Sequence, residues 1–241
     1  MIAVAIISNL VSQCTELDSN QEEADTIILH VITAAEAGAD IIVVCSPDTD
    51  VLVLLLHHCP SIKAKEIYLM TGRQGKQAKL TRFIPIHTIY GSLTRAQHNI
   101  LLPVYGITGC DTVNALLGHG KKKAFWIMMK DADTFQAMTT LGDTTKQGDG
   151  EKAAATQFVS CLYGESTFCG SLNDFRGEKA EKGNAVKKLP PTDDSFMLHL
   201  LQCLYQVLIW KHADIGMLDV PSPIHFEKEV DGQLRPKLVS Q

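Results

Sequence analysis

Acidic residues stand at three separated places along the chain, and each place could supply ligands to a divalent cation. Glu23 and Asp25 open an amphipathic segment, Asp48 and Asp50 follow an apolar run, and Asp111 lies in a Gly-Cys-Asp-Thr turn. Carboxylates that converge in a fold repel one another and are usually tolerated because a cation neutralises them. The pattern therefore predicts a metal centre if the three stretches meet in space.

A basic, glycine-containing segment follows the third acidic position. Gly118 and Gly120 flank a histidine and precede Lys121, Lys122 and Lys123, the most concentrated basic run in the chain. Backbone N–H groups at the start of a helix, together with neighbouring lysines, bind a phosphate backbone without reading its sequence. The alternative is an ordinary glycine-rich connection with solvated lysines.

Each acidic pair also has a simpler interpretation. Glu23 and Asp25 could complement a helix dipole, because acids are favoured in the first turn of a helix. Asp48 could cap a turn at the surface. As strand residues two apart, Asp48 and Asp50 would instead point to one side of a strand end. A third interpretation is the Asp-x-Asp of nucleotide-sugar transferases, which holds a cation against a diphosphate.

The elements expected to position these residues alternate between strand and helix. Residues 19–38 have helical spacing, 40–45 form a uniformly apolar run typical of a central parallel strand, and a helix is expected from residue 51. Strands are expected at 66–70 and 82–89. This rhythm predicts an α/β fold with a doubly wound sheet, whose function gathers beyond the carboxyl ends of its strands.

The second half of the chain is expected to be more irregular. Residues 94–130 have the pattern of a helix, a turn and a helix, and 194–212 return to helical spacing. Residues 131–155 and 170–192 are polar and rich in turn formers, which predicts surface loops. The tail from 220 to 241 carries prolines and little periodicity, so we expect it to be extended or disordered.

Composition narrows the class of protein. A net charge of −5 over 241 residues means that any nucleic-acid contact must use local basic patches. Seven cysteines without a CxxC pair favour reduced thiols in an intracellular protein. The apolar start, Met1 to Ile7, is interpreted as a core strand, and no apolar run reaches the ~18 residues of a membrane span, so no membrane partner is expected. The histidines lack spaced ligand partners and are interpreted as structural.

Residues 21–130 resemble the flap-endonuclease/XPG branch of the PIN-like nucleases. That family has Glu-Ala-Glu on a helix, Asp-x-Asp after the next strand, and Gly-x-Asp before a Gly-Ile-Gly hairpin. Here Glu23-Ala24-Asp25, Asp48-Thr49-Asp50 and Gly109-Cys110-Asp111 match these motifs in the same order. The whole chain is also similar to a group of uncharacterised animal proteins, for which a transposon origin is one interpretation, that share EEADT, DTDVLVLLL and ITGCDT segments.

The resemblance implies a fold, a chemistry and a partner. It implies a partial PIN-like domain over 1–130, in which helices flank a parallel sheet and a helix-hairpin-helix element occupies 109–124. A helical extension over 131–219 and the tail over 220–241 would follow. The five carboxylates would hold two Mg²⁺ or Mn²⁺ ions for phosphodiester hydrolysis, Glu23 and Asp25 at one ion and the rest at the other or shared. The implied partner is a DNA or RNA backbone selected by structure, and the implied location is nuclear.

The chain departs from the family in ways that suggest a second function. The family has two metal-binding aspartates upstream of its Glu-Ala-Glu helix, and neither has a counterpart in this chain, whose first aspartate is Asp18. Asp25 stands where the family has glutamate. Lys121 replaces a frequent proline. These departures indicate either a truncated nuclease or a catalytically inactive module that binds nucleic acid or protein.

Overall fold

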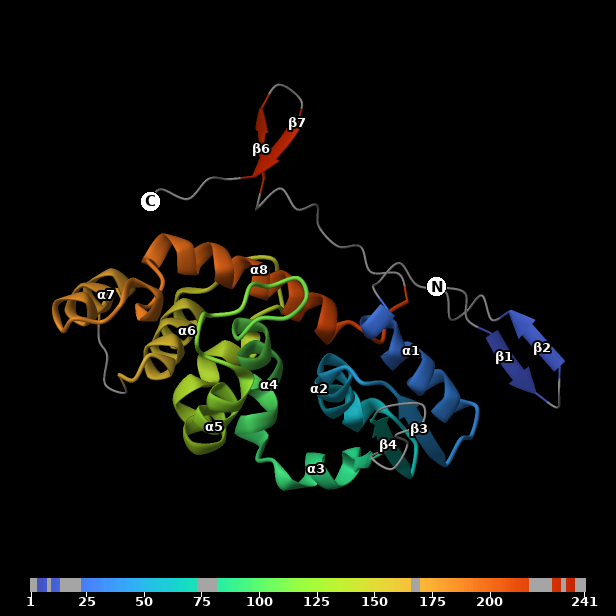
Figure 1. Cartoon of the computed structure of the whole chain (residues 1–241). Helices are drawn as coiled ribbons and strands as arrows, with labels where there is room; N and C mark the ends of the chain where they lie inside the picture. The colour runs from blue at the N-terminus through green and yellow to red at the C-terminus, as the bar shows by residue number, and fades with distance from the viewer. Residues whose placement is uncertain are drawn as a thin grey trace. The chain divides into compact units, whose positions relative to one another are not determined.

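Two structural units share the chain in the computed structural model (Figure 1). The first unit comprises residues 1–94 and 209–219, and the second comprises 95–208 and 220–241. The structure describes residues 4–7, 10–13, 23–72, 82–165, 170–216, 227–230 and 233–236, with side chains for 27–72, 82–165, 170–186 and 188–216.

The first unit is α/β. Its elements in chain order are β1 (Val4–Ile7), β2 (Leu10–Gln13), α1 (Glu23–Glu36), β3 (Ile41–Cys45), α2 (Thr49–His58), the 3-10 turn η2 (Cys59–Ser61), β4 (Glu66–Thr71), β5 (Arg82–Pro85) and α3 (Ile86–Ser92). Helix α1 ends where Gly38 takes a φ of 93°, a backbone conformation that favours glycine. The helix predicted over 19–38 is therefore present over 23–36, and residues 19–22 lie outside the described residues.

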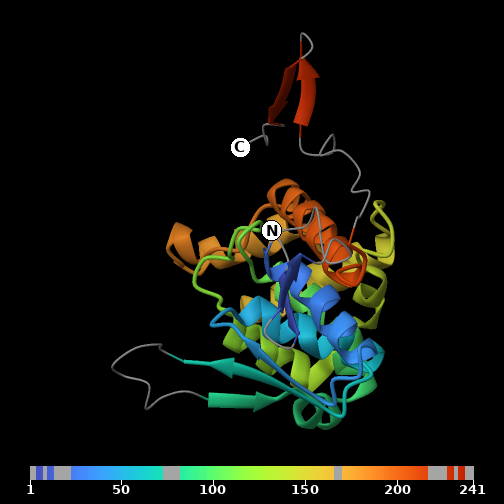
Figure 2. The same cartoon turned by 90° about the vertical axis from the view of Figure 1, so that its right-hand side faces the viewer.

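A three-stranded sheet in the order β3-β4-β5 forms the centre of this unit. Strands β3 and β4 are parallel and are joined through α2, whereas β4 and β5 are antiparallel neighbours (Figure 2). The sheet is therefore mixed, and the prediction of a parallel sheet holds for one of its two strand pairs.

One face of this sheet is covered and the other is exposed. Ile42 and Val44 are buried, whereas their neighbours Ile41 and Val43 are 62% and 46% exposed. Helix α1 contacts both β3 and α2, so both helices pack on the same face. The prediction that 40–45 form a central strand covered on both faces was therefore wrong. Within the described sheet, β3 is an edge strand.

Helix α3 replaces the second half of a predicted strand. The run from 82 to 89 is rich in β-branched residues, but β5 ends at Pro85, which becomes the N-cap of α3. Ile86 at the start of α3 is fully buried. Packing of this residue outweighs the local strand propensity of the segment.

The second unit is helical. Its elements are α4 (Arg95–Ile107), α5 (Lys121–Asp131), the 3-10 helix η4 (Ala132–Thr140), α6 (Asp149–Leu162), α7 (Leu172–Glu181), the 3-10 turn η5 (Val186–Lys188) and α8 (Asp193–Lys211, whose last three residues fall in the first unit), followed by β6 (Glu227–Val230) and β7 (Gln233–Pro236). The predicted helix over 194–212 is confirmed as α8.

The core of the second unit includes segments that the sequence suggested were loops. Phe135 of η4 and Phe158 of α6 are buried and meet edge to face with ring centroids 5.3 Å apart. Phe175 of α7 is also buried. The predicted surface loops over 131–155 and 170–192 are therefore mostly helical, and they supply core side chains.

Each terminal segment contains a two-stranded antiparallel sheet. Strand β1 pairs with β2, so a strand is present where residues 1–7 were expected to form one, although its side chains lie outside the described set. Strands β6 and β7 pair within the tail that we expected to be extended or disordered.

Candidate functional site

The Asp48 side chain caps helix α2. Its Oδ1 atom accepts a hydrogen bond from the backbone N–H of Asp50 at 2.9 Å, and its own N–H donates to Ser46 Oγ at 3.1 Å. This confirms the simpler interpretation of Asp48 as a capping residue. Asp50 lies in the first turn of α2, so the expectation that both carboxylates follow strand alternation was wrong.

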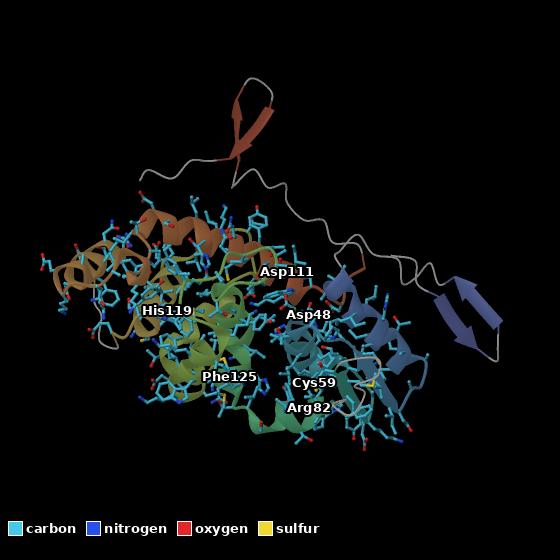
Figure 3. All side chains as sticks on the ribbon, in the orientation of Figure 1. Asp48, Cys59, Arg82, Asp111, His119 and Phe125 are labelled. Carbon is cyan, nitrogen blue, oxygen red and sulfur yellow. The ribbon has the colours of Figure 1, made fainter. Side chains whose placement is uncertain are left out.

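The position of this pair in the sheet still agrees with a site at a strand end. Asp48, labelled in Figure 3, follows the carboxyl end of β3. There Ser46 N–H donates to Met70 O and continues the β3–β4 pairing. Both aspartate side chains are half-buried. One carboxylate oxygen of Asp48 is used by the cap, which leaves the other available to a ligand.

Asp111 lies at an exposed turn after α4. The turn begins at Gly109 with a φ of 97°, and a Cβ there would lie 2.6 Å from the Ala115 backbone. Cys110 N–H donates to Val113 O at 2.9 Å, which closes the turn around Asp111. Close backbone approach therefore requires glycine at 109, and the aspartate projects from a fixed loop.

The five predicted metal ligands are not brought together within one described unit. Asp48 and Asp50 belong to the first unit and Asp111 to the second, while the side chains of Glu23 and Asp25 lie outside the described set. Among described residues, no group of three or more His, Cys, Asp or Glu side chains could hold a metal ion. The two-metal centre for Mg²⁺ or Mn²⁺ stays a prediction.

The predicted phosphate-binding segment leads directly into α5. Gly118 has a φ of 80°, and Gly120 is the N-cap of α5 without a side-chain capping bond. Helix α4 ends at Ile107, so the connection to α5 spans residues 108–120. In the first turn of this eleven-residue helix, Lys123 N–H donates to Gly120 O at 3.1 Å.

The three lysines at the start of α5 have different surroundings. Lys121 Nζ lies 3.2 Å from the centroid of the Tyr105 ring, and Lys123 Nζ donates to the Leu162 carbonyl at the end of α6. Lys122 is exposed and makes no hydrogen bond or ion pair with the described residues. Lys122 is therefore the lysine of the three that can meet a phosphate without leaving an existing contact.

The structure adds an exposed apolar surface that the sequence did not indicate. Phe125, Trp126 and Met129 are 45%, 64% and 37% exposed, and together with Lys122 they form one stripe along α5 (Figure 3 labels Phe125). We call these four residues the α5 outer face. Ala124, Ile127 and Met128 are buried on the other side of the helix. Helical spacing applied to the sequence could have shown that Phe125 and Trp126 lie away from this buried side.

The described histidines divide into structural and unexplained ones. His58 is buried and its Nε2 donates to the Trp210 carbonyl at 2.8 Å, so its structural interpretation is confirmed. Burial lowers the pKa of His58, an effect larger than the opposing hydrogen bond to Trp210. His119 differs, because its Nδ1 is buried without a hydrogen-bond partner in the described part of the chain.

No helix among the described residues combines the length and the apolar character needed to cross a bilayer. Comparisons with protein-family models, with curated proteins and with solved structures each found no match.

Proposed function

We propose that the second unit binds the phosphate backbone of DNA or RNA through the α5 outer face and the start of α5. The observation that carries the proposal is the combination of an exposed lysine with two exposed aromatic rings on one helix face. Aromatic rings stack on the bases of single strands, while lysines and helix amides contact phosphates, so this combination suits sequence-tolerant binding.

The local charge supports this proposal. Lys121, Lys122 and Lys123 occupy the first turn of α5, and the helix carries no acidic residue before Asp131. At the other end of the stripe, Lys130 Nζ lies 5.7 Å from the Trp126 ring centroid and pairs with Asp131 at 3.9 Å, so the positive charge of α5 is concentrated at its start. In a chain of net charge −5, this helix is a local basic patch of the kind that nucleic-acid binding would need.

In this proposal the first unit is a PIN-like domain and the segment from Gly109 to α5 acts as its helix-hairpin-helix element. The parallel crossover β3-α2-β4, with acidic residues after β3, supports the first part. The uncapped start of α5 supports the second part. A nuclear location follows from the same family resemblance.

The test is fluorescence anisotropy with labelled single-stranded, duplex and 5′-flap oligonucleotides. Phe125→Ala and Trp126→Ala are each expected to weaken single-strand binding, because stacking of one base on one aromatic is worth about 1–3 kcal/mol. Phe83→Ala is the matched control, since this aromatic is 57% exposed in the first unit. Equal weakening by Phe83→Ala, or no binding by a folded protein, would overturn the proposal.

A second candidate function is metal-dependent nuclease activity. The specific observation in its favour is Asp48, which lies at the carboxyl end of β3 with one carboxylate oxygen outside its capping bond. Cleavage of a branched DNA flap in Mn²⁺ tests this candidate. The Asp48→Asn/Asp50→Asn protein is the control, because asparagine keeps the capping ability of Asp48 and removes the charge of both ligands. Cleavage that persists in this variant would exclude these residues as its source.

A further inference from the structure

The second unit contains a cavity of about 490 Å³ beside the loop that leads into α5. Its walls come from the loop before α5, from the end of α6, and from α7 with the turn that follows it; the lining side chains include His119, Tyr163, Lys179, Asn184 and Lys188. Small-molecule sites commonly enclose about 300–1,000 Å³, so the volume fits a ligand of nucleotide size.

Two lysines bring positive charge to the lining of this cavity. Lys179 is half-buried in the last turn of α7, with its Nζ 5.2 Å from the Phe175 ring centroid, and Lys188 is exposed at the end of η5. Neither forms an ion pair with a carboxylate among the described residues. Lys182, one turn from Lys179, is instead paired with Glu178 at 3.8 Å.

The lining also includes two aromatic rings. The rings of His119 and Tyr163 lie 4.0 Å apart between centroids, with an interplanar angle of 52° (His119 is labelled in Figure 3). Burial, helped by the nearby charge of Lys123, lowers the pKa of His119 and favours its neutral form. Its Nδ1 atom has no hydrogen-bond partner in the described structure, and an unsatisfied buried polar atom is costly. A ligand that bonds this nitrogen would remove that cost.

Asn184 supplies an oriented polar group. Its Nδ2 donates to the Lys179 carbonyl at 2.8 Å, which fixes the amide and leaves its carbonyl oxygen as an acceptor. The cavity therefore combines two lysines that form no ion pair among the described residues, a tilted aromatic pair and an amide acceptor. Few ligand classes need all three.

We propose that this cavity binds a nucleoside phosphate, with its phosphate paired with Lys179 and Lys188 and its base held against Tyr163 and His119. The ligand is either a free nucleotide or the phosphorylated end of a nucleic-acid strand. The first source is independent of the proposed function, whereas the second rests on it.

Isothermal titration calorimetry of the full chain tests the site with ADP, inorganic pyrophosphate and matched 5′-phosphorylated and 5′-hydroxyl oligonucleotides. ADP is expected to bind saturably and more tightly than pyrophosphate. Lys179→Gln and Lys188→Gln should each weaken ADP at least about tenfold, as expected for loss of a charge-assisted hydrogen bond. Lys182→Gln removes the same charge at the C-cap of α7, outside the cavity, and it should change the affinity less than about twofold.

The outcomes separate the two sources and the two sites. A preference for the 5′-phosphate that disappears in Lys179→Gln identifies a strand end, and ADP binding without that preference identifies a free nucleotide. Phe125→Ala and Trp126→Ala should leave ADP binding unchanged, so failure of the α5 outer face remains distinguishable. No saturable ADP binding, equal loss in Lys182→Gln, or pyrophosphate binding as tight as ADP overturns the proposal. Thermal unfolding of each variant establishes that it is folded.

Discussion

At the start of α5, Lys122 and Lys123 should contribute differently to DNA binding and to stability. Lys122 has no described partner, so Lys122→Gln should remove one phosphate contact and leave stability unchanged. The slope of log K against log salt concentration should then fall in magnitude by about 0.9 for duplex DNA or about 0.7 for a single strand. Lys123 donates to the Leu162 carbonyl, so Lys123→Gln should instead destabilise the protein by about 1 kcal/mol.

The assay pairs two measurements on the same proteins. Fluorescence anisotropy with a labelled duplex over a salt series gives the slope, and urea denaturation gives the free energy of unfolding. Lys63→Gln is the control, because Lys63 is an exposed lysine in the first unit and its loss removes the same charge. The reasoning is refuted if Lys122→Gln leaves the slope unchanged, or if Lys123→Gln lowers the slope without lowering stability.

Three further predictions concern positions with defined contacts. Asp48→Ala should lower the free energy of unfolding by about 1 kcal/mol because it removes the α2 cap, whereas Asp48→Asn should change it little, as urea denaturation would show. Because the pKa of His58 is lowered in the fold, the unfolded chain binds the extra proton. The free energy of unfolding should therefore fall as pH drops below 6.5, the pKa of His58 in the unfolded chain, by at most about 1.4 kcal/mol per pH unit from this group. His58→Gln should remove this contribution to the pH dependence. The same pH profile in wild type and His58→Gln would contradict the prediction. Gly109→Ala should destabilise by more than about 1 kcal/mol in thermal or urea unfolding, since its Cβ would meet the Ala115 backbone, and wild-type stability in this variant would argue against the turn geometry.

Periodicity in the sequence predicted the long helices well. Helices α1 and α8 follow stripes of apolar residues, whereas α2 follows an uninterrupted apolar run. Gly38 marks the end of α1, and Asp48 precedes α2. Residues next to each helix end, such as a glycine or a capping aspartate, set these boundaries, so they can be predicted from the sequence nearby. The capping role of Asp48 was available for the same reason.

The sheet was harder to predict because the sequence of an apolar strand does not show which strands pair with it or which helices cover it. Ile41 and Val43 are as apolar as Ile42 and Val44, yet one pair is exposed and the other buried. Exposure depends on which strands and helices pack on β3, and these come from distant parts of the chain. For the same reason, the burial of Phe135 in η4 and Phe158 in α6 could not be predicted from the sequence, where polar and small residues surround both.

The candidate site was predictable in residue type and less so in role. Three adjacent lysines look equivalent in sequence, but Tyr105 and Leu162 engage two of them from other helices. The cavity depends on side chains from α6, α7 and η5, and no short motif joins them. A cavity of this kind can be recognised only after the helices that line it have been positioned in space.

Tryptophan fluorescence tests the central claim most directly, because the chain has two tryptophans with opposite surroundings. Trp126 on the α5 outer face is 64% exposed and Trp210 is 2% exposed. Titration with a 20-mer of oligo(dT) should quench wild-type fluorescence in step with binding followed by anisotropy, and Trp126→Phe should lose that quenching. Binding that leaves Trp126 fluorescence unchanged, or no binding by a folded chain, would contradict a nucleic-acid interface on α5.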